Sequence, residues 1–567
     1  MIQLLAQTRN PSLQASLAIA ALGAAVFIPF LGAVHLFDWD EINFAESARE
    51  MLVTGNYAQV QVNFQPFWEK PPLFIWLQAL SMHLFGVNEF AARLPNALCG
   101  ILTLVLLFRI GTGLYNQTVG FTWTLAYIGS FLPHFYFKTG IIDPVFNLFI
   151  FLGVYFLFLA LNFPNDDMSS RLWRVATAGA FIGLGILTKG PVALLVSGLC
   201  GAIYVGIKFF QTKRLIATVR DALIFLLSAA TVSSAWFGIE TAKNGFWFLR
   251  EFILYQIGLF SQPIAGHGQP FYYHFFVLLF GVFPASFIAL GAFGKRSSEA
   301  ETQANFKLLM TILFGVVLTI FSISTTKIAH YSSLCYFPLT FLAAHDVHKV
   351  LSGEKDWTPV ATILCALFGA TVALLIMLFP IALCHVDVIL PWIKDDLTKA
   401  VLQTPVAWSG FEWLIGALYF ILILLASMFL FKKNFAVGFG MLFASTALTT
   451  HFFTLFVAPK VERYTQGAPI DFYEQRQGED CYIITGYKSY AHYFYARMKP
   501  PSNPNANNEA WLLSGEIDKP TYFVAKLPDR AWYEEKPSLS LIKVDGGFVF
   551  FKRDVPPSHD STRVGGR

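Results

Sequence analysis

Long apolar runs separated by short polar loops make up most of this chain, up to about residue 457. A helix of about 20 apolar residues is long enough to cross a bilayer. The pattern predicts about thirteen transmembrane helices, at residues 13–36, 93–109, 117–137, 144–162, 173–188, 191–210, 221–240, 271–293, 307–324, 331–347, 358–383, 411–431 and 435–457. We therefore expect an all-α polytopic membrane domain over residues 1–457.

The first polar loop, residues 38–94, follows the first expected span. Apolar and charged side chains alternate there with the period of a helix, which predicts a short amphipathic helix on the membrane surface. Its apolar positions are Phe44, Ala48, Met51 and Leu52, and its charged positions are Glu46, Arg49 and Glu50. The apolar run from Pro72 to Phe85 is short for a crossing. It is either a tilted span or a surface helix, and we favour the surface helix.

Basic residues indicate which side of the membrane each loop faces. If the N-terminus is cytoplasmic, every loop on that side carries a base, as at Arg109, Arg171, Lys213, Lys307, Lys349 and Lys432. This distribution follows the positive-inside rule, and it would be reversed for the later loops if residues 72–85 crossed the bilayer. Thirteen crossings then place the acidic first loop and the C-terminal tail together on the outer side.

The tail, residues 458–567, has the composition of a soluble domain and predicts a small α/β fold. Residues 481–487 and 521–526 are expected to be strands, and residues 490–497 a helix. Residues 539–552 predict a hairpin, because Asp545-Gly546-Gly547 at their centre is a turn sequence. No catalytic motif is evident in this domain, whose last residues, 556–567, are expected to be disordered.

Composition confirms the membrane class and narrows the chemistry. Hydrophobic residues make up 55% and charged residues 13% of the chain, whereas soluble proteins carry about 25% charged residues. The net charge of +4 is small and gives no indication of nucleic-acid binding. The six cysteines form no metal-binding pattern. Most lie in apolar spans, where buried thiols are expected, although Cys384 and Cys481 could pair on one side of the membrane.

Ionisable side chains gather at the outer ends of the spans, where they are costly unless they pair or serve a site. Asp40 and Glu41 follow the first span, and Asp143 begins a later one. Asp143 precedes Pro144, so a helix cap is the alternative explanation for this acid. Two separated carboxylates with several bases suit transfer to an acceptor hydroxyl or amine from an anionic, membrane-bound leaving group.

Lys70 is the base whose placement is most informative. It stands between Glu69 and the pair Pro71-Pro72, and the prolines restrict the backbone on both sides of it. A cation held in this way can stabilise a departing phosphate. For Lys70 and for Arg93 the alternative is snorkelling, in which a long basic side chain reaches the interface from a buried position.

Several short motifs resemble the GT-C glycosyltransferases that use polyprenyl-phosphate sugars, in particular the lipid A aminoarabinose transferases and the protein O-mannosyltransferases. The motifs are Asp40-Glu41, Gly55-Asn56-Tyr57, Trp68-Glu-Lys-Pro-Pro-Leu73, Ala92-Arg-Leu-Pro95, Ile142-Asp-Pro144, Thr188-Lys-Gly-Pro191, His267-Gly-Gln-Pro-Phe271 and Thr326-Lys-Ile-Ala-His-Tyr331. The resemblance covers roughly residues 12–350 in a consistent order. It departs at Asn43 and Phe44, where the aminoarabinose enzymes carry Arg-Tyr.

The resemblance implies an inverting transfer and assigns roles to single residues. Asp40 matches the catalytic acid that acts as base or positions the acceptor, Asp143 matches the second acid, and Glu41 is grouped with them. The residues expected around the donor phosphate are Lys70, Arg93, Lys189, Lys327, His330 and Tyr331. Glu69 and His267 match positions that can hold a divalent metal in the family, such as Zn²⁺, Mg²⁺ or Mn²⁺.

These features predict a glycosyltransferase of the bacterial inner membrane. It would move a sugar from undecaprenyl phosphate to lipid A or another envelope glycolipid, with protein hydroxyls as the alternative acceptor. A flippase for the same lipids is a second hypothesis, disfavoured because the charges gather at one face and no internal repeat is evident. A non-catalytic subunit of polysaccharide assembly is a third.

Overall fold

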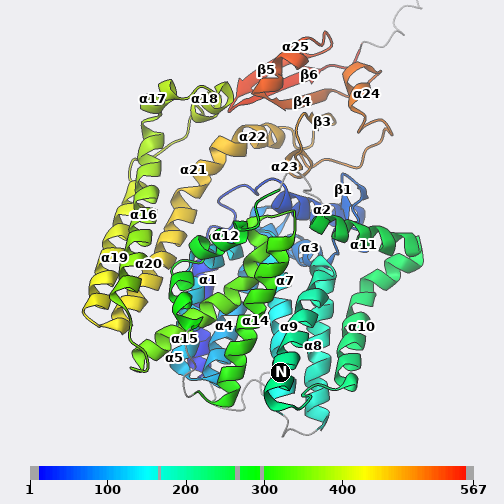
Figure 1. Ribbon diagram of the computed structural model, residues 1–567. Helices are drawn as coiled ribbons and strands as arrows, with labels where there is room; N and C mark the ends of the chain where they lie inside the picture. The colour runs from blue at the N-terminus through cyan, green and yellow to red at the C-terminus, as the bar shows by residue number, and fades with distance from the viewer. Residues whose placement is uncertain (1–11, 164–167, 262–267, 294–298, 557–567) are drawn as a thin grey trace, which may run out of the picture.

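The computed structural model describes residues 12–163, 168–261, 268–293 and 299–556 (Figure 1). Most of the described chain is helical, and a four-stranded sheet caps one end of the helical bundle. Eight described helices are long and apolar enough to cross a membrane, and a ninth crossing results if one bent helix pair is counted. The expected class, a mostly helical membrane protein with a small C-terminal sheet domain, is confirmed.

A helix lies at each expected span. They are α1 (Leu13–Phe27), α4 (Glu89–Leu114), α5 (Gln117–Ile128), α7 (Asp143–Asn162), α8 (Met168–Lys189), α9 (Val192–Thr212), α10 (Val219–Asn244), α14 (Glu301–Ile323), α15 (Tyr336–Leu351), α16 (Pro359–Cys384), α19 (Trp413–Phe431) and α20 (Phe435–Phe456). The expected span 271–293 is the bent pair α12 (Tyr273–Gly281) and α13 (Ala285–Ala289).

Some expected spans are longer than the helices that the structure contains. The first helix ends at Phe27 rather than near residue 36, because Pro29 has no backbone N–H to continue it. The span expected over 117–137 stops at Ile128 and resumes as the short helix α6 (Phe131–Phe135). The segment from the end of α1 to Asp40 is therefore a loop, and that loop reaches the cluster of acids.

The expected surface helix is α2 (Asp40–Thr54), but it is buried rather than lying at a water interface. Every residue from Glu41 to Met51 is buried, including the charged ones. Arg49 donates to Glu46 at 2.7 and 2.6 Å and to the carbonyl of Met498 in the C-terminal domain at 2.8 Å. The C-terminal domain packs on this helix, so its charged residues are buried against protein.

Helix α3 (Leu73–Phe85) contains 13 residues, which at 1.5 Å per residue is about 20 Å, shorter than a hydrocarbon core of about 30 Å. The length agrees with a surface position. A small hairpin, β1 (Gln61–Val62) and β2 (Gln65–Pro66), connects α2 to α3. Helix α11 (Phe246–Ser261) occupies a segment expected to be a loop. Helices α2, α3 and α11 lie at the end of the bundle that carries the sheet (Figure 1).

The sheet has the order β3-β4-β6-β5. Its strands are β3 (Tyr482–Thr485), β4 (Thr521–Lys526), β5 (Ser540–Asp545) and β6 (Phe548–Arg553). Strands β3 and β4 are parallel, and the other neighbours are antiparallel. The predicted strands and hairpin are confirmed, and both Gly546 (φ 58°) and Gly547 (φ 82°) have the positive φ that a tight two-residue turn requires.

The remaining helices are short. They are α17 (Val386–Ile389), α18 (Asp396–Leu402), α21 (Ala458–Glu462), α22 (Ala468–Glu474), α23 (Ala491–Tyr495), α24 (Glu509–Ser514) and α25 (Arg530–Glu534). Two of them, α21 and α22, lead from α20 to the first strand of the sheet. One apolar cluster includes Ala48 and Met51 of α2, Ala91 of α4 and Phe494 of α23. The sheet domain is thus packed onto the first loop. All six cysteines are free, so Cys384 and Cys481 do not pair.

Candidate functional site

Two carboxylates from separate helices meet around one imidazole. Asp40 is the first residue of α2 and Asp143 the first residue of α7. His330 Nε2 lies 3.4 Å from Asp40 Oδ2 and 3.7 Å from Asp143 Oδ2. Lys189, the last residue of α8, places its Nζ 2.6 Å from Asp143 Oδ1. Four residues that the sequence singles out are therefore brought together, although nearly 300 positions separate the first from the last.

Residues of the C-terminal domain hold the loop before Asp40 in place. Trp39 has a φ of 78°, an unusual value for a residue with a side chain, and such backbone conformations cost about 1–3 kcal/mol. Asp38 Oδ1 accepts hydrogen bonds from the backbone N–H of Trp39 at 2.8 Å and of Tyr490 at 3.0 Å. Gln466 accepts from the N–H of Asp38 at 3.1 Å. These contacts stabilise the turn that aims Asp40 toward His330.

The two acids differ in exposure. The side chain of Asp40 is 37% exposed, whereas that of Asp143 is 5% exposed. An incoming molecule can therefore contact Asp40 directly, while Asp143 lies deeper and is neutralised by Lys189. This division of the pair into an accessible and an inner carboxylate favours different roles for the two acids.

Asp40 is held in its ionised form. The surrounding protein removes water and by itself raises the pKa of this carboxyl. The neighbouring His330 and the positive charges of Lys70 and Lys189 outweigh that effect and hold the pKa of Asp40 well below its usual range. Asp40 is consequently an accessible carboxylate that can accept a proton at neutral pH.

A narrow cavity next to the acids presents cations to an anionic ligand. Its lining residues are Lys70, Phe146, Lys189, Val192, Gln256, Phe321, Ser324 and Tyr331. Lys189 Nζ lies 4.6 Å from the centre of the Tyr331 ring. Lys70 has no ion pair with any acid in the part of the chain that the structure describes. Lys327 is buried and donates to the carbonyl of Ser324, which lines the same cavity.

Arg93 and Glu41 form a different arrangement. They are 4% and 3% exposed and make two contacts, 3.0 Å from Nε to Oε1 and 2.8 Å from Nη2 to Oε2. Arg93 also donates to the carbonyls of Leu31, Val34 and His35. Glu41 accepts from the backbone N–H groups of Phe37 and Gly140. The sequence predicted a phosphate ligand and a catalytic acid here, and in the structure the two side chains bind each other and the loop before Asp40.

Of the two predicted metal ligands, Glu69 and His267, the structure describes only Glu69. Glu69 Oε2 accepts a hydrogen bond from Tyr255 Oη at 2.6 Å, and His267 lies outside the described residues. Within the described residues Glu69 belongs to no group of three metal-ligating side chains. The described residues alone do not assemble a metal site at Glu69.

Helix α11 contributes residues that sequence reasoning missed. Tyr255 holds Glu69, and the buried Gln256 lines the cationic cavity. The segment around them, Phe246-Trp-Phe-Leu-Arg-Glu-Phe-Ile-Leu-Tyr-Gln-Ile257, is apolar with isolated polar residues at helical spacing. That periodicity is the signal that could have identified it as a helix.

Three comparisons bear on this geometry. Residues 69–237 match the family of dolichyl-phosphate-mannose-protein mannosyltransferases. An undecaprenyl phosphate-alpha-4-amino-4-deoxy-L-arabinose arabinosyl transferase of Photorhabdus laumondii is 28% identical over 388 residues, covering 68% of this chain and 66% of the relative. A second such transferase, from Proteus mirabilis, is 27% identical over 325 residues, covering 57% of each chain. The chain thus matches less than two thirds of the length of these relatives.

The fold has a solved counterpart. The crystal structure of ArnT from Cupriavidus metallidurans bound to undecaprenyl phosphate aligns with a TM-score of 0.74 at 16% identity, covering 98% of this chain and 100% of the other. At this identity the match shows a shared fold. The chain is thus similar in sequence to protein O-mannosyltransferases and aminoarabinose transferases, and it shares the fold of the Cupriavidus protein.

Proposed function

We propose that this protein transfers a sugar from undecaprenyl phosphate to lipid A or another envelope glycolipid at the periplasmic face of a bacterial inner membrane. The observation that carries the proposal is the meeting of Asp40 and Asp143 at His330, beside a cavity lined by Lys70 and Lys189. The names of the relatives and the undecaprenyl phosphate bound to the Cupriavidus protein support this donor class.

The topology that we propose has thirteen crossings, a cytoplasmic N-terminus and a periplasmic C-terminal domain over residues 458–567. In support, helices or broken helices lie at all thirteen expected positions, and eight of the described helices are long and apolar enough to cross a membrane. The loops between α15 and α16 and between α19 and α20, which carry Lys355 and Lys432, lie at the end of the bundle away from the sheet (Figure 1). The site and the sheet lie together at the other end.

In the proposed reaction the donor phosphate binds near Lys70 and Lys189. The bond between the anomeric carbon of the sugar and the phosphate oxygen breaks, and its electron pair leaves with undecaprenyl phosphate. The positive charges offset the negative charge that grows on this leaving group, which is the main electrostatic contribution expected of such a site. Phe146, Val192 and Phe321 restrict water around these charges.

The acceptor attacks from the side of Asp40. An acceptor hydroxyl forms the new bond to the anomeric carbon from the face opposite the phosphate, so the configuration inverts, and its proton passes to the Asp40 carboxylate. Asp143 lies beside His330 and is paired with Lys189, so these three residues form the inner wall of the site. The exposure of Asp40 supports this assignment, because a base must be within reach of the acceptor.

An apolar cavity supports a lipid substrate. It measures about 640 Å³ and is lined by residues that include Phe37, Phe135, Leu375, Phe379, Phe453 and Val461. Phe37 lies three positions before Asp40, so a hydrocarbon chain held there would have its head group near the acids. Burial of apolar surface contributes about 25 cal/mol per Å² and can retain such a chain.

The replacement Lys70→Met is expected to lower kcat/KM for the lipid-linked sugar by roughly 10- to 100-fold, because one charged contact to phosphate contributes about 1.5–3 kcal/mol. The effect should fall on kcat as well as on the donor KM, because the negative charge near Lys70 grows as the bond to the phosphate oxygen breaks. Lys432→Met, an exposed lysine at the far end of the bundle, is the matched control and should be neutral. Equal kinetics in the two variants would remove Lys70 from the phosphate site.

The replacement His330→Gln is expected to shift the acid limb of the pH–rate profile upward by roughly 1–3 pH units. Without the imidazole, only Lys70 and Lys189 oppose the effect of burial, so the pKa of Asp40 rises and the base is protonated at a higher pH. His83→Gln, at an exposed position in α3, is the control. A profile whose acid limb does not move would mean that His330 does not set the ionisation of Asp40.

The function is tested with the purified protein in lipid nanodiscs, undecaprenyl phosphate-4-amino-4-deoxy-L-arabinose as first donor and lipid A as acceptor. We expect lipid A to gain the mass of one sugar residue. A protein substrate that gains the sugar while lipid A does not would identify the protein O-glycosyltransferase alternative. Movement of the donor across a vesicle without any product would identify the flippase.

A further inference from the structure

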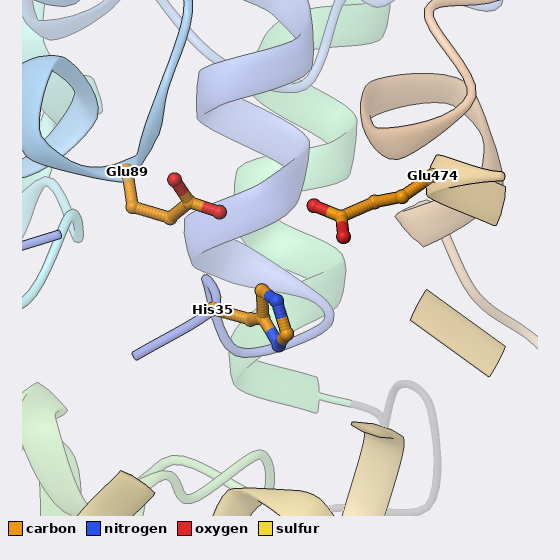
Figure 2. A group of neighbouring side chains, drawn as sticks. All are labelled: His35, Glu89 and Glu474. Carbon is orange, nitrogen blue, oxygen red and sulfur yellow. The ribbon is translucent and has the colours of Figure 1, made fainter. Parts of the chain in front are cut away.

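A second cluster of ligand-type side chains lies outside the acid pair. Figure 2 shows the carboxylates of Glu89 and Glu474 pointing toward each other beside the ring of His35. One ligand atom from each of the three residues lies within 4.8 Å of the other two. The residues come from the loop after α1, from the first residue of α4 and from the last residue of α22. This group, His35, Glu89 and Glu474, is called the clamp cluster below.

His35 is oriented as metal-binding histidines are. Its Nδ1 lies 3.1 Å from Oε1 of the buried Glu462, which can accept the Nδ1 proton. A histidine that donates one ring N–H to a carboxylate keeps the lone pair of the other nitrogen free, and such carboxylate–histidine pairs are typical behind metal ligands. The edge-on ring of Tyr495, with ring centres 5.4 Å apart, also restricts the imidazole.

The clamp cluster carries more negative than positive charge. Glu89, Glu462 and Glu474 surround a single histidine, and the two bases that line the same cavity, Lys460 and Arg463, pair with other acids. Lys460 pairs with Glu412, Arg463 pairs with Asp471 at 2.6 Å, and Arg497 donates to the carbonyl of Val87 at 2.6 Å. Among the described residues, no lysine or arginine forms an ion pair with Glu89 or Glu474. A bound cation would offset this surplus.

The site is also accessible to an ion. His35, Glu89 and Glu474 line a cavity of about 630 Å³ between the bundle and the C-terminal domain. Ligand atoms about 2.0–2.2 Å from a tetrahedral metal lie roughly 3.3–3.6 Å apart, so these side chains need to approach one another by about 1 Å. Glu474 is exposed, and its side chain can rotate to make this approach.

We propose that His35, Glu89 and Glu474 form a divalent cation site for Zn²⁺, with Glu462 orienting the histidine. Imidazole nitrogen and carboxylate oxygen are both zinc ligands, and a water would complete the fourth position. The site is separate from Glu69 and His267, and the proposal does not depend on the identity of the sugar or of the acceptor.

The proposed ion would join parts of the chain that are distant in sequence. It would tie α4 and the loop after α1 to α22 of the C-terminal part. The carbonyl of His35 accepts from Arg93, and the neighbouring Leu36 donates its N–H to Tyr495 Oη at 2.7 Å. The bound metal would therefore stabilise the loop that ends at Asp40, without contacting substrate.

The test measures zinc in the full-length detergent-purified protein after exhaustive dialysis against a weak chelator. We expect the double variant His35→Gln/Glu474→Gln to lose about one equivalent of zinc per chain relative to the wild type. Glu69→Gln serves as the control, because it alters the other predicted metal position and should keep the equivalent that the double variant loses. Equal zinc content in the wild type and the double variant, or no saturable zinc binding by the wild type, would overturn the proposal.

Thermal unfolding distinguishes loss of zinc binding from a folding defect in the variants. In EDTA the wild type and the single variant Glu474→Gln, changed at an exposed position, should have the same Tm. Added zinc should raise the Tm of the wild type and of Glu69→Gln, because a ligand that binds only the folded state stabilises it. An equal rise in Glu474→Gln would contradict the assignment of Glu474.

Discussion

Asp40→Asn is expected to lower kcat for sugar transfer by roughly 10²- to 10⁴-fold, the contribution of a positioned general base. The amide has the size of the carboxylate but cannot accept a proton, so binding of the donor should change little. Asp40 is the accessible acid of the pair, and its lowered pKa keeps it ionised at neutral pH. The measurement is single-turnover transfer in nanodiscs with both substrates saturating.

The matched control for this variant is Asp356→Asn, an exposed aspartate in the loop between α15 and α16. It should transfer sugar at the rate of the wild type. If Asp40→Asn retained more than about a tenth of the wild-type rate, Asp40 would not be the base. The proposed division of roles, with Asp40 as the base and Asp143 as the inner acid, would then be wrong.

Arg93→Met is expected to destabilise the protein by about 3–5 kcal/mol, because it leaves the buried Glu41 carboxylate without its cation. The replacement also removes the donors to three backbone carbonyls of the loop that leads to Asp40. The free energy of unfolding in detergent, compared between variant and wild type, measures the loss.

Two further variants distinguish the effect of an unpaired Glu41 carboxylate from a general loss of packing. Arg530→Met removes an arginine whose ion pair with Glu534 is about 40% exposed, and it should change the free energy by less than about 0.5 kcal/mol. The double variant Glu41→Gln/Arg93→Met should recover part of the stability, since no uncompensated charge remains. A loss in Arg93→Met no larger than that in Arg530→Met would contradict the role of Arg93 in holding Glu41 and the loop before Asp40.

Much of the fold was predictable because the membrane makes a simple physical demand. Spans must be apolar over their whole length, so hydropathy alone located thirteen helical segments, as for α7 and α14. The hairpin at Gly546 and Gly547 was predictable from its turn sequence. Within the proposed site, the proximity of Asp40, Asp143, Lys189 and His330 was expected, because each stands at the outer end of an expected span.

The remainder depended on contacts that no local pattern encodes. The sequence grouped Arg93 with the phosphate ligands, but its partner Glu41 lies 52 positions away and was itself expected to be catalytic. Helix α2 has an amphipathic pattern, yet its polar face is buried because the C-terminal domain accepts from Arg49. The clamp cluster brings together His35 and Glu474, which lie before and after almost all of the membrane domain in the sequence. Sequence periodicity carries no information about contacts between residues so far apart in the chain.

Mass spectrometry of lipid A and other envelope glycolipids tests the central claim most directly, in cells that contain the protein, lack it, or carry Asp40→Asn in its place. The account predicts one glycolipid that bears an additional sugar only when the wild-type protein is present, and its lipid-linked donor accumulating in the other two strains. Identical glycolipids in all three strains, or full modification by Asp40→Asn, would contradict the account.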